Sequence, residues 1–142
     1  MRRVLVDLAI GLGLAVLGQF VQMGAGALGS AAGLPFPYES APEDGTIPPA
    51  LLTQISLMFA LAALGMLIIT LVLGRLLKVP SARQGAARGG EWAVVVGLSQ
   101  FLLGLGEGVV PVFGLAGTWV YLAAVVIGPV LAGLMGRRRR AA

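Results

Sequence analysis

Cysteine and histidine are absent from the 142 residues of the chain, and charged residues make up only 11% of it. Without thiols or imidazoles, the chain has no disulfide, no thiolate metal site, no cysteine nucleophile and no imidazole acid–base chemistry. Soluble domains carry roughly 25% charged residues, so this chain has too few charges to cover a water-facing surface. These absences favour a membrane protein over a soluble enzyme.

Long apolar runs dominate the rest of the sequence. Hydrophobic residues make up 58% of the chain, and the mean hydropathy is +0.95. Four runs reach the ~20 residues that an α-helix needs to cross a ~30 Å hydrocarbon core. They cover approximately residues 4–32, 50–77, 93–114 and 115–136. The sequence therefore predicts an all-α integral membrane protein, with four transmembrane helices in a bundle that forms a single membrane domain over residues 1–142.

The basic residues predict how the four helices are oriented. All ten Lys and Arg side chains flank the apolar runs on one side: they precede the first run, surround an expected inner loop at 78–92, and form a basic tail at 137–142. The expected outer loop at 33–49 carries only acidic charges, Glu39, Glu43 and Asp44. Under the positive-inside rule both termini are cytoplasmic. The Arg-, Ala- and Gly-rich composition resembles that of a high-GC bacterium, so we expect the chain to lie in the plasma (inner) membrane.

Glycine is abundant, with 22 residues, and each apolar run carries small residues along one helix face. Association of helices in lipid depends on close packing through such residues. The residues expected to pack helices together are Gly11, Gly18, Gly97, Gly104, Gly108 and Gly128. These stripes alone are consistent with a compact bundle and require no further function.

Uncharged polar residues gather near one depth of the predicted bundle, toward its outer side. Glu107 lies within the third apolar run, ~21 Å beyond Ala93 along a helix. The residues expected to form a polar cavity with it are Gln19, Gln22, Thr53, Gln54, Ser56 and Gln100. Asp7, near the inner boundary, is expected to pair with Arg2, Arg3 or solvent.

Three interpretations of Glu107 remain open. It is a satisfied structural residue, neutral or hydrogen-bonded to a glutamine. Alternatively, it is a proton- or cation-linked site, as ionisable residues within membranes often are. In a third interpretation the helix ends before it, because Gly104, Gly106, Gly108 and Pro111 weaken helical structure.

The same residues predict a transporter or a transport-system component, with Glu107 as the ion-linked group, acting as a homo-oligomer or with a larger membrane-protein partner in the lipid bilayer. The alternative is a non-catalytic structural or assembly subunit that docks through its glycine-rich faces. No enzyme is expected, because paired carboxylates, histidine and cysteine are absent from the apolar runs. No cofactor, metal or nucleic acid is expected either.

Overall fold

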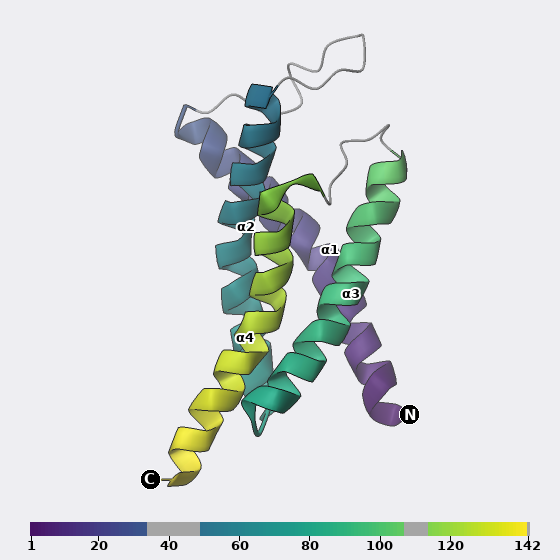
Figure 1. Ribbon diagram of the computed structural model, residues 1–142, viewed down its shortest axis with the longest axis vertical. Helices are drawn as coiled ribbons and strands as arrows, with labels where there is room; N and C mark the ends of the chain where they lie inside the picture. The colour runs from purple at the N-terminus through teal and green to yellow at the C-terminus, as the bar shows by residue number, and fades with distance from the viewer. Residues whose placement is uncertain (34–48, 107–113, 142) are drawn as a thin grey trace.

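The computed structural model describes residues 1–33, 49–106 and 114–141, with backbone alone at 50, 51, 104–106 and 138–141. These residues form an all-helical structure of four long helices (Figure 1). The helices are α1 (Arg2–Ala31), α2 (Pro49–Leu76), α3 (Ala82–Gly106) and α4 (Ala116–Ala141). In the described part of the chain, three segments are long and apolar enough to cross a membrane: Arg2–Ala31, Leu52–Leu76 and Ala116–Arg137.

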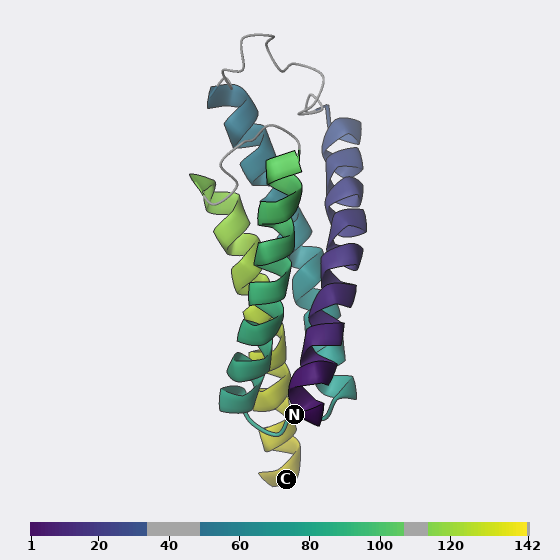
Figure 2. The same cartoon turned by 90° about the vertical axis from the view of Figure 1, so that its right-hand side faces the viewer.

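The helices run alternately up and down, so both termini and the turn between α2 and α3 lie at the same end of the molecule (Figures 1 and 2). We call this end the basic end, because the described Lys and Arg residues flank the helix termini that meet there. Helix α4 packs along α2 and α3. Helix α1 runs obliquely across the bundle and packs on α3 and α2 (Figure 1).

The centre of the bundle is filled by side chains from all four helices. Leu14, Met66 and Val96 are fully or almost fully buried, and the rings of Phe59 and Tyr121 meet edge to face, with centroids 5.8 Å apart. In contrast, large apolar side chains remain exposed along the outward faces of all four helices, a pattern expected of a surface that faces lipid.

Helix α3 begins at Ala82, so most of the segment expected to be the inner loop, 78–92, is helical. Ser81 accepts a hydrogen bond at its hydroxyl from the backbone N–H of Gln84, at 3.3 Å, and caps the helix. The Ser-x-x-Gln spacing is a helix-start signal that the sequence already contains. The polar composition of residues 82–92 indicated a loop, whereas packing against α4 keeps them helical. The expected basic tail at 137–142 is likewise helical as far as Ala141.

Helix α2 ends in a Schellman turn at the basic end. The backbone N–H of Val79 donates to the carbonyl of Gly74, and that of Lys78 to the carbonyl of Arg75, both at 3.0 Å. Lys78 has φ of 51°, a left-handed conformation for which glycine is preferred. Pro80 follows and prevents the helix from continuing. A charged side chain thus occupies a position that ordinarily favours glycine.

Glycines allow α3 to approach α4 closely at the basic end. A Cβ on Gly89 would lie 2.8 Å from Cα and 2.9 Å from the carbonyl oxygen of Val126. The same atom would lie 3.2 Å from the carbonyl oxygen of Val125, which lacks its usual helical donor because Pro129 has no N–H. Gly85 likewise faces the backbone of Pro129. Both contacts require a residue without a side chain.

Candidate functional site: buried polar groups at the two ends of the bundle

The basic end contains a buried carboxylate. Asp7 on α1 and Trp92 on α3 are both completely inaccessible to solvent. The indole Nε1 of Trp92 donates a hydrogen bond to Oδ1 of Asp7, at 3.2 Å. Because Trp92 lies one helix turn beyond Gly89, the glycine contacts with α4 and the indole contact with α1 are made by the same stretch of α3.

Two arginines compensate the charge of Asp7. The Nε atoms of Arg3 and Arg88 lie 3.5 Å and 3.7 Å from Oδ2 of Asp7. Arg3 is about half exposed, whereas the side chain of Arg88 is 20% exposed. A buried carboxylate is tolerated when it is paired and hydrogen-bonded, so this arrangement explains how Asp7 is accommodated. The expected pairing of Asp7 with Arg3 is present, and Arg88 and Trp92 are partners that the sequence analysis missed.

A second group of buried polar atoms lies between the middle of the bundle and the opposite end. The Gln22 and Gln100 side chains are buried on α1 and α3, and Thr118 and Tyr121 are fully buried on α4. The side chains of Gln22 and Tyr121 adjoin each other. The Nε2 atoms of both glutamines and the hydroxyls of Thr118 and Tyr121 nevertheless have no partner of acceptable hydrogen-bond geometry in the described part of the chain.

The other residues expected to form a polar cavity have different surroundings. Gln19 is partly buried, and its inaccessible Nε2 atom has no hydrogen-bond partner among the described residues. Gln54 is partly buried on α2. The hydroxyl of Ser56 accepts a hydrogen bond from the backbone N–H of Gly117, at 2.8 Å, which joins α2 to α4. Thr53 is exposed, and its hydroxyl donates to the carbonyl of Pro49 in its own helix, at 3.1 Å. Thr53 therefore does not face the interior.

The glycines singled out for packing occupy interhelical positions where their surroundings are described. A Cβ on Gly11 would lie 2.9 Å from Cβ of Val95 on α3. On Gly18 it would meet the hydroxyl of Tyr121, and on Gly128 the hydroxyl of Thr70. Gly97 is buried on α3. Gly104 is helical, with only its backbone described, and Gly108 and Glu107 lie outside the described residues.

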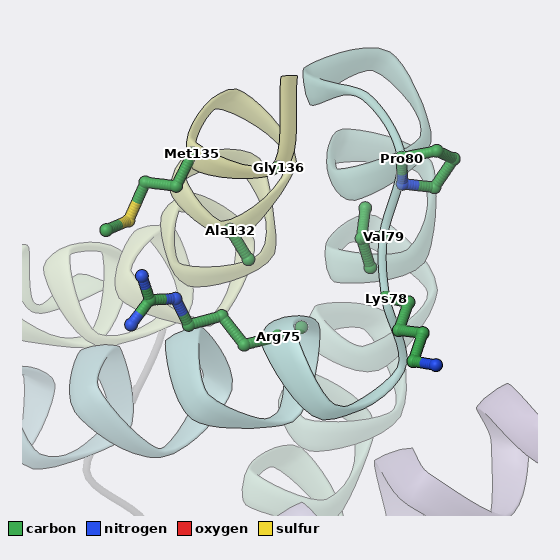
Figure 3. Close-up of a pocket in the computed structure, with 8 residues that line it drawn as sticks. Arg75, Lys78, Val79, Pro80, Ala132, Met135 and Gly136 are labelled. Atoms are coloured by element: carbon green, nitrogen blue, oxygen red, sulfur yellow. The ribbon is translucent and has the colours of Figure 1, made fainter. Parts of the chain in front are cut away.

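The basic end also contains a pocket of about 390 Å³ between the C-terminal turn of α2 and the last turns of α4 (Figure 3). Its lining residues are Gly74, Arg75, Lys78, Val79, Pro80, Ala132, Met135 and Gly136. In Figure 3, the guanidinium of Arg75 extends beside Met135, whereas the ammonium of Lys78 extends from the other side of the turn. The pocket combines an apolar wall with two cations at its edges.

Neither region offers a metal site in the part of the chain that the structure describes, because no group of three or more acidic side chains converges there. Comparisons with protein-family models, curated proteins and solved structures found no match. The architecture defines the class of the protein as an all-helical protein whose long apolar helices are suited to a membrane.

Proposed function

We propose that the chain is an integral membrane protein with four membrane-spanning helices and both termini in the cytoplasm of a bacterium. Three helices meet the length and hydropathy required for crossing, and α3 runs alongside α1 and α4 in the same bundle. Both termini and the α2–α3 turn share the basic end, which the positive-inside rule assigns to the cytoplasm.

Within that membrane, the protein acts as a small transporter or as a component of a transport system. The observation that carries this proposal is a set of buried polar atoms on α1, α3 and α4, between the middle of the bundle and the end opposite the basic end, that have no partner of acceptable hydrogen-bond geometry among the described residues. A polar atom buried without a hydrogen-bond partner costs about 1–3 kcal/mol. Groups of this kind are kept where they interact with water, an ion or a substrate. Glu107, expected from the sequence to lie in this half, is the proposed proton- or cation-linked group.

Flux measurements on purified protein in liposomes test the proposal. We expect wild-type protein to increase proton or alkali-cation flux above that of empty liposomes. The substitutions Glu107→Gln and Gln22→Leu should each reduce the flux. Thr53→Val is the matched control, because Thr53 is exposed and bonded to its own helix, and it should retain wild-type flux. Equal flux from wild type, Glu107→Gln and Gln22→Leu would contradict the proposed transport site.

The second candidate is a structural or assembly subunit of a larger membrane complex, and an open face of α1 favours it. A Cβ on Gly13 or Gly24 would have no atom of the described residues within 4 Å. Leu17 and Phe20, which lie between these glycines on the same helix face, are exposed. Such a face suits close approach of another helix. Identification of proteins that copurify in mild detergent separates the candidates: a stoichiometric larger partner favours the subunit, and a homo-oligomer alone favours transport.

A further inference from the structure

Within the described residues, the basic end carries more positive charge than acidic side chains neutralise. The carboxylates among the described residues are Asp7 and Glu91, both in the α1–α3 region, and Asp7 is already paired with Arg3 and Arg88. Arg75 and Lys78 are exposed and form no ion pair within the described residues. A negatively charged group from outside the chain is therefore the natural partner of these two cations.

The shape of the pocket suits a molecule with a charged head and an apolar body. Val79, Ala132 and Met135 provide its apolar wall, and Arg75 and Lys78 lie at its edges. Met135 is 40% exposed, and Leu131 and Ile127, spaced four residues apart along the same face of α4, are also exposed. An acyl chain that begins at the pocket would follow this face toward the middle of the bundle.

The backbone conformation of Lys78 is a separate indication that the pocket is a binding site. Its φ of 51° places a β-carbon where glycine would avoid steric cost. Strained residues of this kind often accompany binding sites. Lys78 is one of the residues that line the pocket, and it adds a positive charge there that glycine would not.

We propose that this pocket binds the headgroup of an anionic phospholipid through Arg75 and Lys78, with one acyl chain along Met135, Leu131 and Ile127. Basic pockets between helices at the cytoplasmic side of a membrane are suited to such headgroups. The adjacent Arg137, which is exposed, adds positive charge near the same headgroup. This inference rests on the proposed membrane insertion and is independent of transport activity.

Native mass spectrometry of the full chain in detergent, titrated with phosphatidylglycerol or phosphatidylcholine, tests the proposal. We expect wild-type protein to bind phosphatidylglycerol more tightly. Because one basic residue near an anionic surface contributes about a fivefold change in affinity, Arg75→Gln and Lys78→Gly should each weaken binding about fivefold. Lys78→Gly also relieves the left-handed strain, so a loss of binding there does not come from unfolding. Thermal unfolding without lipid verifies that each variant is folded.

Arg83→Gln is the matched control, because Arg83 is an exposed arginine of the basic end that does not line the pocket. It should bind phosphatidylglycerol like wild type. Wild-type binding by both pocket variants, or no preference for phosphatidylglycerol over phosphatidylcholine, would overturn the proposal. An equal loss in Arg83→Gln would assign the binding to diffuse surface charge. Displacement of the lipid by equimolar glycerol phosphate would instead indicate a site for a soluble phosphate. A variant that no longer binds the lipid should keep wild-type ion flux in liposomes. The lipid-binding proposal and the transport proposal can therefore fail separately.

Discussion

Trp92 donates a hydrogen bond from its indole Nε1 to Oδ1 of Asp7, joining α3 to α1 across 85 residues of sequence. Both side chains are fully buried. A long apolar helix seldom buries a carboxylate, and here an indole N–H and two guanidinium groups make it tolerable. The pair also sets where the basic end of α1 lies along α3.

The Asp7–Trp92 contact should be visible as a coupling energy. We expect Trp92→Phe to lower the free energy of unfolding by about 1–3 kcal/mol, because Oδ1 of Asp7 loses its donor while the aromatic packing is largely kept. Combined with Asp7→Ala, the double variant should lose less than the sum of the two single losses, by about 0.5–3 kcal/mol. Unfolding by a denaturing detergent in mixed micelles measures these values.

As a control for this coupling, the same comparison of single and double variants is made with Arg2→Ala in place of Trp92→Phe. Arg2 is exposed and forms no ion pair within the described residues. Its effect should therefore add to that of Asp7→Ala. Additive losses for Asp7 and Trp92 would show that the hydrogen bond contributes nothing to stability.

Adjacent glycines on α3 should respond in opposite ways to alanine. Gly89→Ala forces a methyl group against the backbone of Val126, and such overpacking typically costs about 1–3 kcal/mol. A Cβ on Gly90 would have nothing within 4 Å, so Gly90→Ala should raise stability by up to about 1 kcal/mol through helix propensity. Thermal unfolding in detergent compares the two variants. A similar shift in both would mean that α3 does not approach α4 as closely as described.

Gly18 and Tyr121 provide a test of steric rescue. Gly18→Ala places a methyl group where the Tyr121 hydroxyl lies, so it should lower stability by about 1–3 kcal/mol. Tyr121→Phe removes that hydroxyl, which has no partner of acceptable geometry in the described part of the chain. The double variant should therefore recover most of the loss of Gly18→Ala. Gly13→Ala, at an open position of α1, should not depend on Tyr121 in the same unfolding measurement. Absence of rescue contradicts the α1–α4 contact.

The proposed topology is directly testable because the chain contains no cysteine. Ala32→Cys and Ala86→Cys introduce single thiols at exposed positions at opposite ends of the bundle. In intact cells, a membrane-impermeant maleimide should label Ala32→Cys and spare Ala86→Cys, because the basic end is predicted to be cytoplasmic. Both should react after the membrane is disrupted. Labelling of Ala86→Cys alone in intact cells would reverse the orientation.

Local composition was sufficient to predict the helices whose apolar segments are uninterrupted. Helices α1, α2 and α4 contain long apolar runs, and their bounds lie close to the expected ones at most ends. Local composition was insufficient to predict the start of α3, because the first half of this helix, 82–92, is polar and contains glycines. The Ser81–Gln84 spacing is a helix-start signal that the expected loop at 78–92 did not take into account. Glu107, the expected centre of the site, lies outside the described residues, so its role stays a prediction.

The sequence by itself determined a membrane-type composition, the positions of the apolar helices and the asymmetry of charge, because each depends on residue type along a short stretch of chain. Tertiary structure decided the pairing of Asp7 with Trp92 and Arg88, the contacts of Gly85 and Gly89 with α4, and the pocket beside Arg75. These features depend on the rotation and crossing of helices that are distant in sequence. A helical pattern specifies which residues share a face, but not which neighbour that face will meet.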